Sequence, residues 1–366
     1  MIGLGGLSHV LSKPDRPGMP GDASRRGYRP MKSPFSKFLF LLVVLLLSPV
    51  AGCGHGGPEI LKRTQFLMGT LVEITVIARN DQASADALSG AFEVMRRIER
   101  LMSRRIEGSD VWRVNRAAGR KAVKISGDVL CVMEKALQVS DLSGGAFDPT
   151  VGSLVSLWDR CWKGDRVPSR GEVASALARV GYRDLQIDED KGALFLRREG
   201  MELALGGIAK GYAVDRAFRF LKDLGFKALI VDAGGDLRTG GTKFGAPWVV
   251  GIQDPRDESR LMATVEVKEA AVATSGDYER YFIKDGVRYH HILDPVTGFP
   301  ARRSRSVTVF SDRLVWADAL ATAVFVLGPE RGMALVESLP GTEALIVDGE
   351  GRVSISSGMG GRIRFQ

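Results

Sequence analysis

The chain has 366 residues, 45% of them hydrophobic, so it is long enough to form one large domain, of two lobes, around a sizeable core. Its formal net charge of +8 raises the possibility of nucleic-acid binding, but residues 1–52 supply five of the eight net charges. No cluster of Lys and Arg interleaved with aromatic residues follows, so we expect no nucleic-acid partner.

The N-terminal segment carries the pattern of a secretory signal. Residues 38–47 (FLFLLVVLLL) are uninterruptedly apolar, follow Lys32 and Lys37, and precede the small-residue stretch VAGC that ends at Cys53. An apolar run of this length is typical of a cleaved signal peptide and is too short for a standard membrane-spanning helix. The VAGC stretch resembles a bacterial lipobox, in which the cysteine carries the lipid. The alternative is a signal anchor with an incidental cysteine.

This segment predicts the organisation of the whole chain. We expect an extension and lipoprotein signal peptide over residues 1–52, a lipid-anchored leash over 53–60, and one folded domain over 61–366. The mature protein would lie outside the cytoplasm, on the periplasmic side, attached to a membrane at Cys53. Export permits a disulfide, and a Cys131–Cys161 pair is left open, although Cys131 fits a buried apolar position on a helix.

The hydrophobic pattern alternates between strands and helices along the chain. It predicts a strand over 70–78, then a helix with apolar positions from Leu88 to Met102, and a second helix over 127–139. Further helices are expected over 170–179, 208–224, 313–327 and 329–338, and short strands over 228–232, 248–253, 262–268, 287–291, 305–310 and 343–347. These elements follow no regular βαβ period, which favours an α+β fold with mixed sheets flanked by helices.

A lone carboxylate marks one of these helices. Residues 311–328 (SDRLVWADALATAVFVLG) are apolar on nearly every side of a helix, which predicts burial, and Asp318 is the one ionisable residue between Arg313 and Glu330. Burying an unpaired carboxylate is costly unless a metal or another partner compensates it. Thr322 lies one turn later on the same face, and two such oxygens suit Mg²⁺. The alternative is a buried Asp satisfied by an Arg or by backbone N–H groups.

Three glycine-rich turns are candidate ligand sites. Residues 205–211 (LGGIAKG) open the helix predicted over 208–224, where free N–H groups and Lys210 could meet a phosphate. The other two are residues 232–236 (DAGGD) and 273–277 (ATSGD). None is a Walker A or GxGxxG motif, and each alone also fits a plain turn.

His290 and His291 are the histidines available to a folded site, because His55 lies in the leash. If residues 287–292 form a strand, the two rings point to opposite faces, so one can be structural and the other functional. His291 lies closer to the turn at residues 294–295, and loops often carry functional residues.

Eight motifs, taken in chain order, resemble the ApbE-type FAD:protein FMN transferase family. They are residues 68–70 (MGT), 109–115 (SDVWRVN), 145–150 (GAFDPT), 206–215 (GGIAKGYAVD), 233–236 (AGGD), 273–276 (ATSG), 291–298 (HILDPVTG) and 318–322 (DALAT). Each is weak alone, but their order across residues 61–330 is specific. The resemblance implies a domain that moves FMN from FAD onto a threonine of an exported target protein.

The resemblance also implies a role for each matching position. The FAD site would comprise Met68, Ala146, Phe147, Asp148, Lys210 and Ile292. The Mg²⁺ site would comprise Gly207, Asp318, Ala321 and Thr322, with Gly207 contributing through backbone oxygen. His291, rather than His290, matches the histidine associated with transfer, and His291 or a nearby carboxylate would take the proton of the threonine hydroxyl while Lys210 steadies the pyrophosphate. The implied partners are FAD, an acceptor flavoprotein subunit of a membrane electron-transport complex, and the membrane through the lipid anchor.

Three positions depart from the family pattern. Ala204 stands where the family usually has Asp, which removes a polar contact to FAD. Arg105 stands where an aromatic residue is common, although a guanidinium can also stack on a flavin. Asp232 replaces a usual Asn. The expected activity is Mg²⁺-dependent FMN transfer with release of AMP; the alternatives are a Mg²⁺-dependent FAD pyrophosphatase and a non-catalytic FAD-binding lipoprotein.

Overall fold

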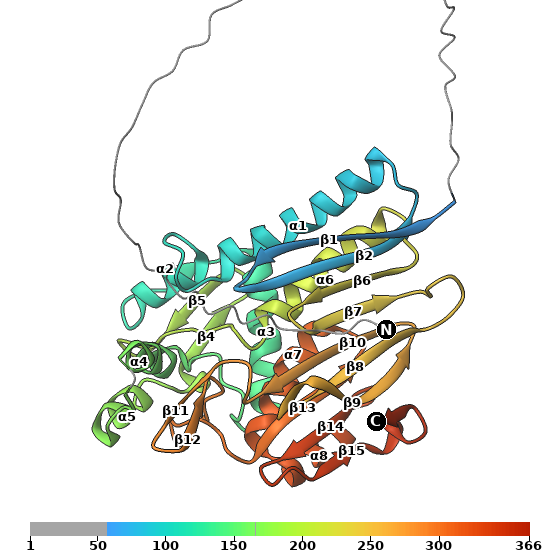
Figure 1. The fold of residues 1–366 in the computed structure, drawn as a ribbon. Coiled ribbons are helices and arrows are strands. Elements are labelled where there is room, and N and C mark those ends of the chain that lie inside the picture. Colours follow the sequence, from blue (N-terminus) through green and yellow to red (C-terminus); the bar gives the residue numbers. More distant parts are fainter. Residues whose placement is uncertain (1–56, 165) are drawn as a thin grey trace, which may run out of the picture. The chain divides into compact units, whose positions relative to one another are not determined.

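The computed structural model describes residues 57–366 except residue 165, and these residues belong to one compact unit (Figure 1). The predicted signal peptide and residues 53–56 of the leash, including the lipidation residue Cys53, lie outside the described residues. Within the described part, no helix has both the length and the apolar character needed to cross a membrane.

An eight-stranded sheet forms the centre of the fold, in the order β1-β2-β6-β7-β10-β13-β14-β15 (Figure 1). Its strands are β1 (Glu59–Leu67), β2 (Thr70–Ala78), β6 (Leu229–Ala233), β7 (Asp236–Gly240), β10 (Ala270–Gly276), β13 (Ser304–Ser311), β14 (Glu343–Asp348) and β15 (Val353–Ile355). The alternation in β2 explains its place, because Val72, Ile74 and Val76 all point into the core with no exposed surface.

The predicted α+β class is confirmed, while the strand directions differ from the mixed arrangement expected. All neighbouring strands of the central sheet are antiparallel. Tight turns connect β1 to β2 and β6 to β7, and such hairpins require antiparallel strands. Between β13 and β14 two consecutive helices return the chain, so this pair is antiparallel as well.

Three smaller sheets complete the strand content. They contain β8 (Trp248–Asp254), β9 (Asp257–Val267) and β16 (Ile363–Phe365); β3 (Val123–Lys124), β4 (Leu185–Asp188) and β5 (Ala193–Leu196); and the hairpin β11 (Tyr281–Lys284) with β12 (Val287–His290). The β8–β9–β16 sheet packs on one face of the central sheet, where Trp248 and Val265 share a buried cluster with Leu345 of β14.

Helices cover the other face of the central sheet, while α4 and α5 pack in a separate cluster with the β11–β12 hairpin. The helices are α1 (Gln82–Met102), α2 (Asp110–Ala117), α3 (Gly127–Leu142), α4 (Gly152–Lys163), α5 (Arg170–Leu177), α6 (Ala209–Asp223), α7 (Leu314–Leu327) and α8 (Pro329–Glu337), with short 3₁₀ turns at Tyr182–Asp184 and Ser357–Met359. Helices α1, α3, α6 and α7 share the largest buried cluster with β2 and β6. All six helices predicted from the sequence are observed, as α1, α3, α5, α6, α7 and α8, whereas α2 and α4 were not predicted.

The two cysteines of the described domain are both free thiols, so the disulfide left open does not form. Cys161 of α4 is fully buried. Cys131 of α3 was expected to be buried but is only half-buried. It packs at the edge of the main hydrophobic cluster, and its sulfur lies 3.4 Å from Nζ of Lys135, one turn along the helix.

Candidate active site

Asp318 lies on α7, the most thoroughly buried helix of the fold, and is 5% exposed. Its Oδ2 accepts a hydrogen bond from the backbone N–H of Gly211 at 2.9 Å. A Cβ atom at Gly211 would lie 2.3 Å from the carbonyl oxygen of Leu314, so only glycine allows α6 to approach α7 this closely. The glycine therefore brings the first turn of α6 onto the carboxylate.

Thr322 lies one turn further along α7 and meets the segment before α6. A Cβ atom at Gly207 would lie 2.9 Å from Oγ1 of Thr322 and 3.4 Å from the ring of Phe147. Oγ of Ser275, in β10, lies 3.4 Å from the same Oγ1 atom. The fold thus gathers Gly207, Phe147 and Thr322, which are far apart in the sequence, at one place.

Lys210 and Asp236 add opposite charges beside Asp318. Lys210, in the first turn of α6, forms an ion pair with Asp236 at the start of β7. Asp236 also accepts a hydrogen bond from the N–H of Thr274 at 3.0 Å. The prediction from sequence assigned no role to Asp236, although it ends the AGGD motif.

The pKa shifts follow from this arrangement. Burial acts to lower the pKa of Lys210, but the charges of Asp236 and Asp318 outweigh it and raise that pKa, so the ammonium keeps its proton. Burial, together with repulsion from Asp236, raises the pKa of Asp318 well above its usual range. The carboxylates of Asp236 and Asp318 thus face the single ammonium of Lys210. When both are ionised, the three groups together carry a net negative charge inside the protein.

The donor set fits a magnesium ion. Within residues 57–366, residue 165 apart, no three His, Cys, Asp or Glu side chains come together as a metal cluster. The carboxylate of Asp318 and the hydroxyl of Thr322, one turn apart on α7, are oxygen donors, which suit a hard cation that keeps water and phosphate ligands. A cation there would also relieve the surplus negative charge. Ala321, in the same turn of α7, is 1% exposed.

The two adjacent histidines have different environments. His290 ends β12 and is 5% exposed. Its Nε2 lies 2.6 Å from the carbonyl oxygen of Ala301 and must donate, while Nδ1 accepts from the N–H of Ile292 at 3.2 Å. Both ring nitrogens are therefore used inside the protein, and His290 is structural.

His291 follows the strand and is only partly enclosed. Its Nδ1 lies 3.3 Å from the carbonyl oxygen of Arg280, which also accepts the backbone N–H of His291 at 3.1 Å. A carbonyl only accepts, so Nδ1 carries the proton and Nε2 is free to accept one. Burial, with the positive charges of Arg280 and Lys210 nearby, lowers the pKa of His291 to about 3, so the ring is neutral at physiological pH.

The residues predicted to line the flavin site are buried or make hydrogen bonds within the protein. Met68 has φ 54° in the tight β1–β2 turn, and its N–H donates to Glu99 at 3.0 Å. Ala146, Phe147 and Ile292 are buried. Asp148 is buried too, and its carboxylate accepts hydrogen bonds from the N–H groups of Thr150 at 2.7 Å and of Tyr182 at 3.0 Å. Their part in flavin binding stays a prediction.

Two residues of the SDVWRVN motif hold the backbone in place. Ser109 caps α2 by accepting the N–H of Trp112 at 2.9 Å. The amide of Asn115 bonds the backbone of Leu203 twice, accepting its N–H at 2.7 Å and donating to its carbonyl at 3.1 Å. The motif thus fixes the segment that leads into residues 205–211.

Asp215, the last residue of the GGIAKGYAVD motif, connects α6 to α7. It accepts the N–H groups of Leu314 at 3.1 Å and Val315 at 3.0 Å, which are the first of α7 and have no partner within the helix. It also pairs with Arg238 of β7 at 2.6 Å. One carboxylate therefore caps the helix that carries Asp318 and Thr322.

The positions that depart from the expected pattern are accommodated locally. Arg105 is 68% exposed at its side chain and pairs with Asp159 at 2.8 Å. The N–H of Ala204 donates to the carbonyl of Pro149 at 2.8 Å, a bond that needs no side chain. Neither position disturbs the buried cluster around Asp318.

Asp232 is the third departure, and its environment leads to a stability prediction. It is 6% exposed, pairs across the sheet with Glu73, and accepts the N–H of Gly235 at 2.8 Å. Burial, with repulsion from Asp236 and Glu73, raises the pKa of Asp232 to about 7. The folded protein therefore holds a proton that the unfolded chain releases, and the free energy of unfolding falls as the pH rises from about 4 to about 7.

Asp232→Asn should remove this loss, because an amide oxygen can accept the same N–H without carrying charge. We expect the variant to be more stable than the parent by about 2 kcal/mol at pH 8, with a gain that shrinks toward pH 4. Thermal unfolding between pH 4 and 8 measures the difference, and Asp190→Asn at an exposed turn serves as the control. A gain that is the same at every pH would contradict the explanation.

Comparisons with known proteins agree in family and in fold. A family model described as the ApbE family matches residues 68–346. The FAD:protein FMN transferase of Treponema pallidum is 36% identical over 352 residues, which cover 91% of this chain and 97% of that protein. That of Klebsiella pneumoniae is 34% identical over 301 residues, with 82% and 92% covered. The crystal structure of the ApbE protein from Thermotoga maritima superposes with a TM-score of 0.76 at 38% identity, covering 82% of this chain and 98% of that one. The flavin transferase ApbE from Vibrio cholerae gives 0.73 at 31% identity, with the same coverage.

Proposed function

The chain belongs to the ApbE family and is an FAD:protein FMN transferase, and we propose that it requires Mg²⁺, acts on a threonine of an exported or membrane flavoprotein and releases AMP. The observation that carries the proposal is the buried group of Asp318, Asp236 and Lys210 at the start of α6. This group provides charges of both signs where a diphosphate and a cation would meet.

Lys210 and the first turn of α6 would bind the diphosphate of FAD. The ammonium stays protonated because Asp236 and Asp318 raise its pKa, so it offers a permanent positive charge to the phosphates. The N-terminus of α6 adds a partial positive charge, although the N–H groups of Ala209 and Gly211 already bond Leu205 and Asp318. Together they would hold the diphosphate in line for attack, and positioning supplies much of the rate in phosphoryl transfer.

Mg²⁺ would be held by Asp318, by Thr322 and by backbone oxygens at Gly207 and Ala321, and when bound it would neutralise charge on the diphosphate. The carboxylate of Asp318 is held in place by the N–H of Gly211 at 2.9 Å. This bond leaves its other oxygen, Oδ1, available to a cation.

His291 would accept the proton of the attacking threonine at Nε2. The threonine oxygen forms a new bond to the phosphorus of the FMN half, and the bond between this phosphorus and the bridging oxygen breaks. The bridging oxygen leaves as part of AMP, so one phosphoanhydride bond is replaced by one phosphoester bond. The neutral His291 ring, with Nδ1–H held by Arg280, is in the form that a general base requires.

The setting of the reaction is part of the proposal. The signal pattern before Cys53 supports a lipid-anchored protein on the periplasmic side of a membrane. A protein anchored there would meet acceptor flavoprotein subunits of membrane electron-transport complexes.

Mass spectrometry of an acceptor tests the function directly. The protein is incubated with FAD, Mg²⁺ and a threonine-bearing acceptor subunit, and the mass of the acceptor is measured. We expect a gain equal to one FMN group with release of AMP, and loss of both when EDTA removes the metal. Free FMN and AMP with an unmodified acceptor would indicate a pyrophosphatase instead. FAD that stays bound without any product would indicate a carrier.

A further inference from the structure

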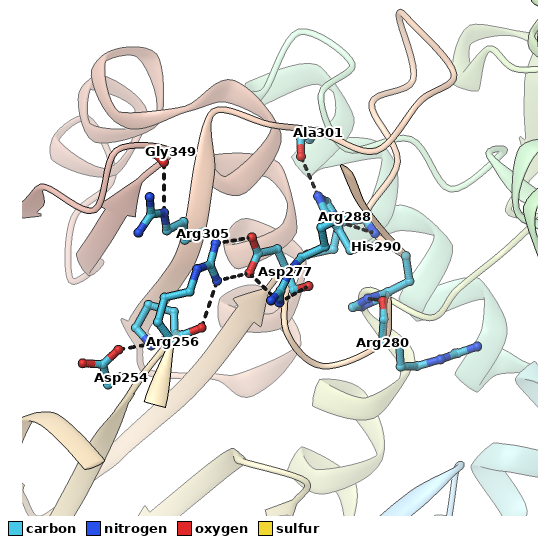
Figure 2. Close-up of polar contacts among 12 residues, drawn as sticks. Asp254, Arg256, Asp277, Arg280, Arg288, His290, Ala301, Arg305 and Gly349 are labelled. Carbon is cyan, nitrogen blue, oxygen red and sulfur yellow. Dashed lines mark hydrogen bonds and ion pairs between the residues drawn. The ribbon is translucent and has the colours of Figure 1, made fainter. Parts of the chain in front are cut away.

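The loop between β10 and β11, residues 277–280, begins at a buried carboxylate. Asp277 is 7% exposed, and Arg256 from the β8–β9 turn grips it at two points (Figure 2). Nη1 of Arg256 lies 2.7 Å from Oδ1 of Asp277, and Nη2 lies 2.8 Å from Oδ2. A two-point arginine–carboxylate pair fixes orientation as well as distance.

Further contacts fix both partners of this pair. The N–H of Asp277 donates to the carbonyl of Arg305 at 3.0 Å, which ties the loop to β13. Arg288 of β12 approaches Oδ1 of Asp277 at 3.7 Å. The N–H of Arg256 donates to Asp254 at 2.9 Å, so the guanidinium projects from an ordered turn (Figure 2). The start of the loop is therefore held from three strands or turns.

The end of the same loop touches the candidate base. Arg280 comes three residues after Asp277, and its carbonyl oxygen accepts the backbone N–H of His291 at 3.1 Å and Nδ1–H of the ring at 3.3 Å. At 3.3 Å the ring bond is long, so a small shift of the carbonyl would break it. Only two residues separate Asp277 from Arg280, so a displacement of Asp277 can be passed on to this carbonyl.

We propose that Arg256 is a positioning residue for the reaction: its grip on Asp277 holds the carbonyl of Arg280 where it keeps the proton of His291 on Nδ1 and leaves Nε2 free. This inference rests on the proposed role of His291 as the base. Without the pair the loop relaxes, the ring loses its partner, and the other tautomer, with Nε2 blocked by its own proton, becomes populated.

A purely structural role of Arg256 needs a control, because the carboxylate that it binds is buried. Its own side chain is 37% exposed, but loss of the pair removes the two-point partner of Asp277 and is expected to lower stability as well. Arg364 provides a comparison in the same three-stranded sheet, because it pairs with Glu266 at 3.0 Å, is 75% exposed at its side chain and has no contact with the loop. If Arg256 acted through stability alone, its variants would unfold more easily without any change in the His291 tautomer.

The experiment compares Arg256→Gln, Arg256→Lys and Arg364→Gln with the parent protein. Nitrogen-15 NMR of the imidazoles reports which ring nitrogen carries the proton, and a His291→Gln spectrum assigns the signal. His290, whose Nε2 donates to Ala301, serves as an internal reference of the opposite tautomer. Rates of FMN transfer and thermal unfolding are measured on the same samples.

We expect Arg256→Gln to shift His291 from the Nδ1–H form to a mixture and to lower kcat roughly 10-fold, with KM for FAD within about twofold of the parent. Arg256→Lys keeps the charge but not the two-point contact, so its tautomer ratio and kcat should lie between those of the parent and of Arg256→Gln. It also tests the inference if Arg256→Gln folds poorly. Arg364→Gln should match the parent in every measurement.

Two results would overturn the inference. One is an unchanged His291 tautomer in both Arg256 variants. The other is a loss of kcat that Arg364→Gln reproduces, because the effect would then belong to the sheet. If His291 is not the base, His291→Gln will transfer FMN at the parental rate. The NMR spectra still show in that case whether Arg256 orients the His291 ring.

Discussion

Asp318→Asn is expected to lower FMN transfer by about 10³-fold while leaving the protein folded. An asparagine oxygen can still accept the N–H of Gly211, so the contact between α6 and α7 remains. The negative charge that would hold Mg²⁺ is lost. Because burial and Asp236 raise the pKa of Asp318, the charged form is unfavourable in the fold, and the variant should be at least as stable as the parent at pH 8.

Transfer rates from acceptor mass spectra, with thermal unfolding of the same samples, measure this prediction. Asp348→Asn is the matched control, because Asp348 is also 5% exposed but lies at the end of β14 and bonds Arg352. It should keep the parental rate. Transfer by Asp318→Asn within tenfold of the parent at saturating Mg²⁺ would remove Asp318 from the proposed metal site.

His291→Gln and His290→Gln are expected to have opposite effects. The first removes the proposed base and should lower kcat by about 10² to 10⁴-fold, with little change in stability. The second leaves buried groups without partners, namely the carbonyl of Ala301 and the N–H of Ile292. It should lower the free energy of unfolding by about 1 to 3 kcal/mol, with a smaller effect on kcat.

The pH dependence of kcat tests the same assignment. Burial lowers the pKa of His291 to about 3, so the ring stays neutral as the pH falls through 6.5, where an ordinary histidine would take up a proton. No loss of kcat attributable to His291 is expected between pH 8 and 5. A loss centred near pH 6.5 that His291→Gln abolishes would contradict the environment described for the ring.

The fold was predictable wherever local pattern decided it. The continuous apolar run of α7 was predicted over 313–327 and is observed at Leu314–Leu327. By contrast, β7 (DLRTG) and β10 (AAVATSG) have little strand character of their own. They become strands because the central sheet pairs them with each other and with β6 and β13, which no local pattern reveals.

The site was predictable in part, for a related reason. Asp318 and Thr322 lie one helical turn apart, so periodicity alone places them together. Asp236 meets Lys210 only because β7 lies beside α6, and that depends on the sheet order. Motif matching could not separate chemistry from architecture: Asn115 and Asp215 fall inside the same motifs, yet their side chains bond backbone.

The cap that Asp215 provides has a consequence for the energy of the reaction. By joining the start of α7 to α6, and through Arg238 to β7, it couples the three elements that carry Asp318, Lys210 and Asp236. These charges are therefore oriented before a nucleotide arrives, and little reorganisation is needed as charge develops in the transition state. The work of assembling mutually repelling carboxylates is done once, during folding, and not at each turnover.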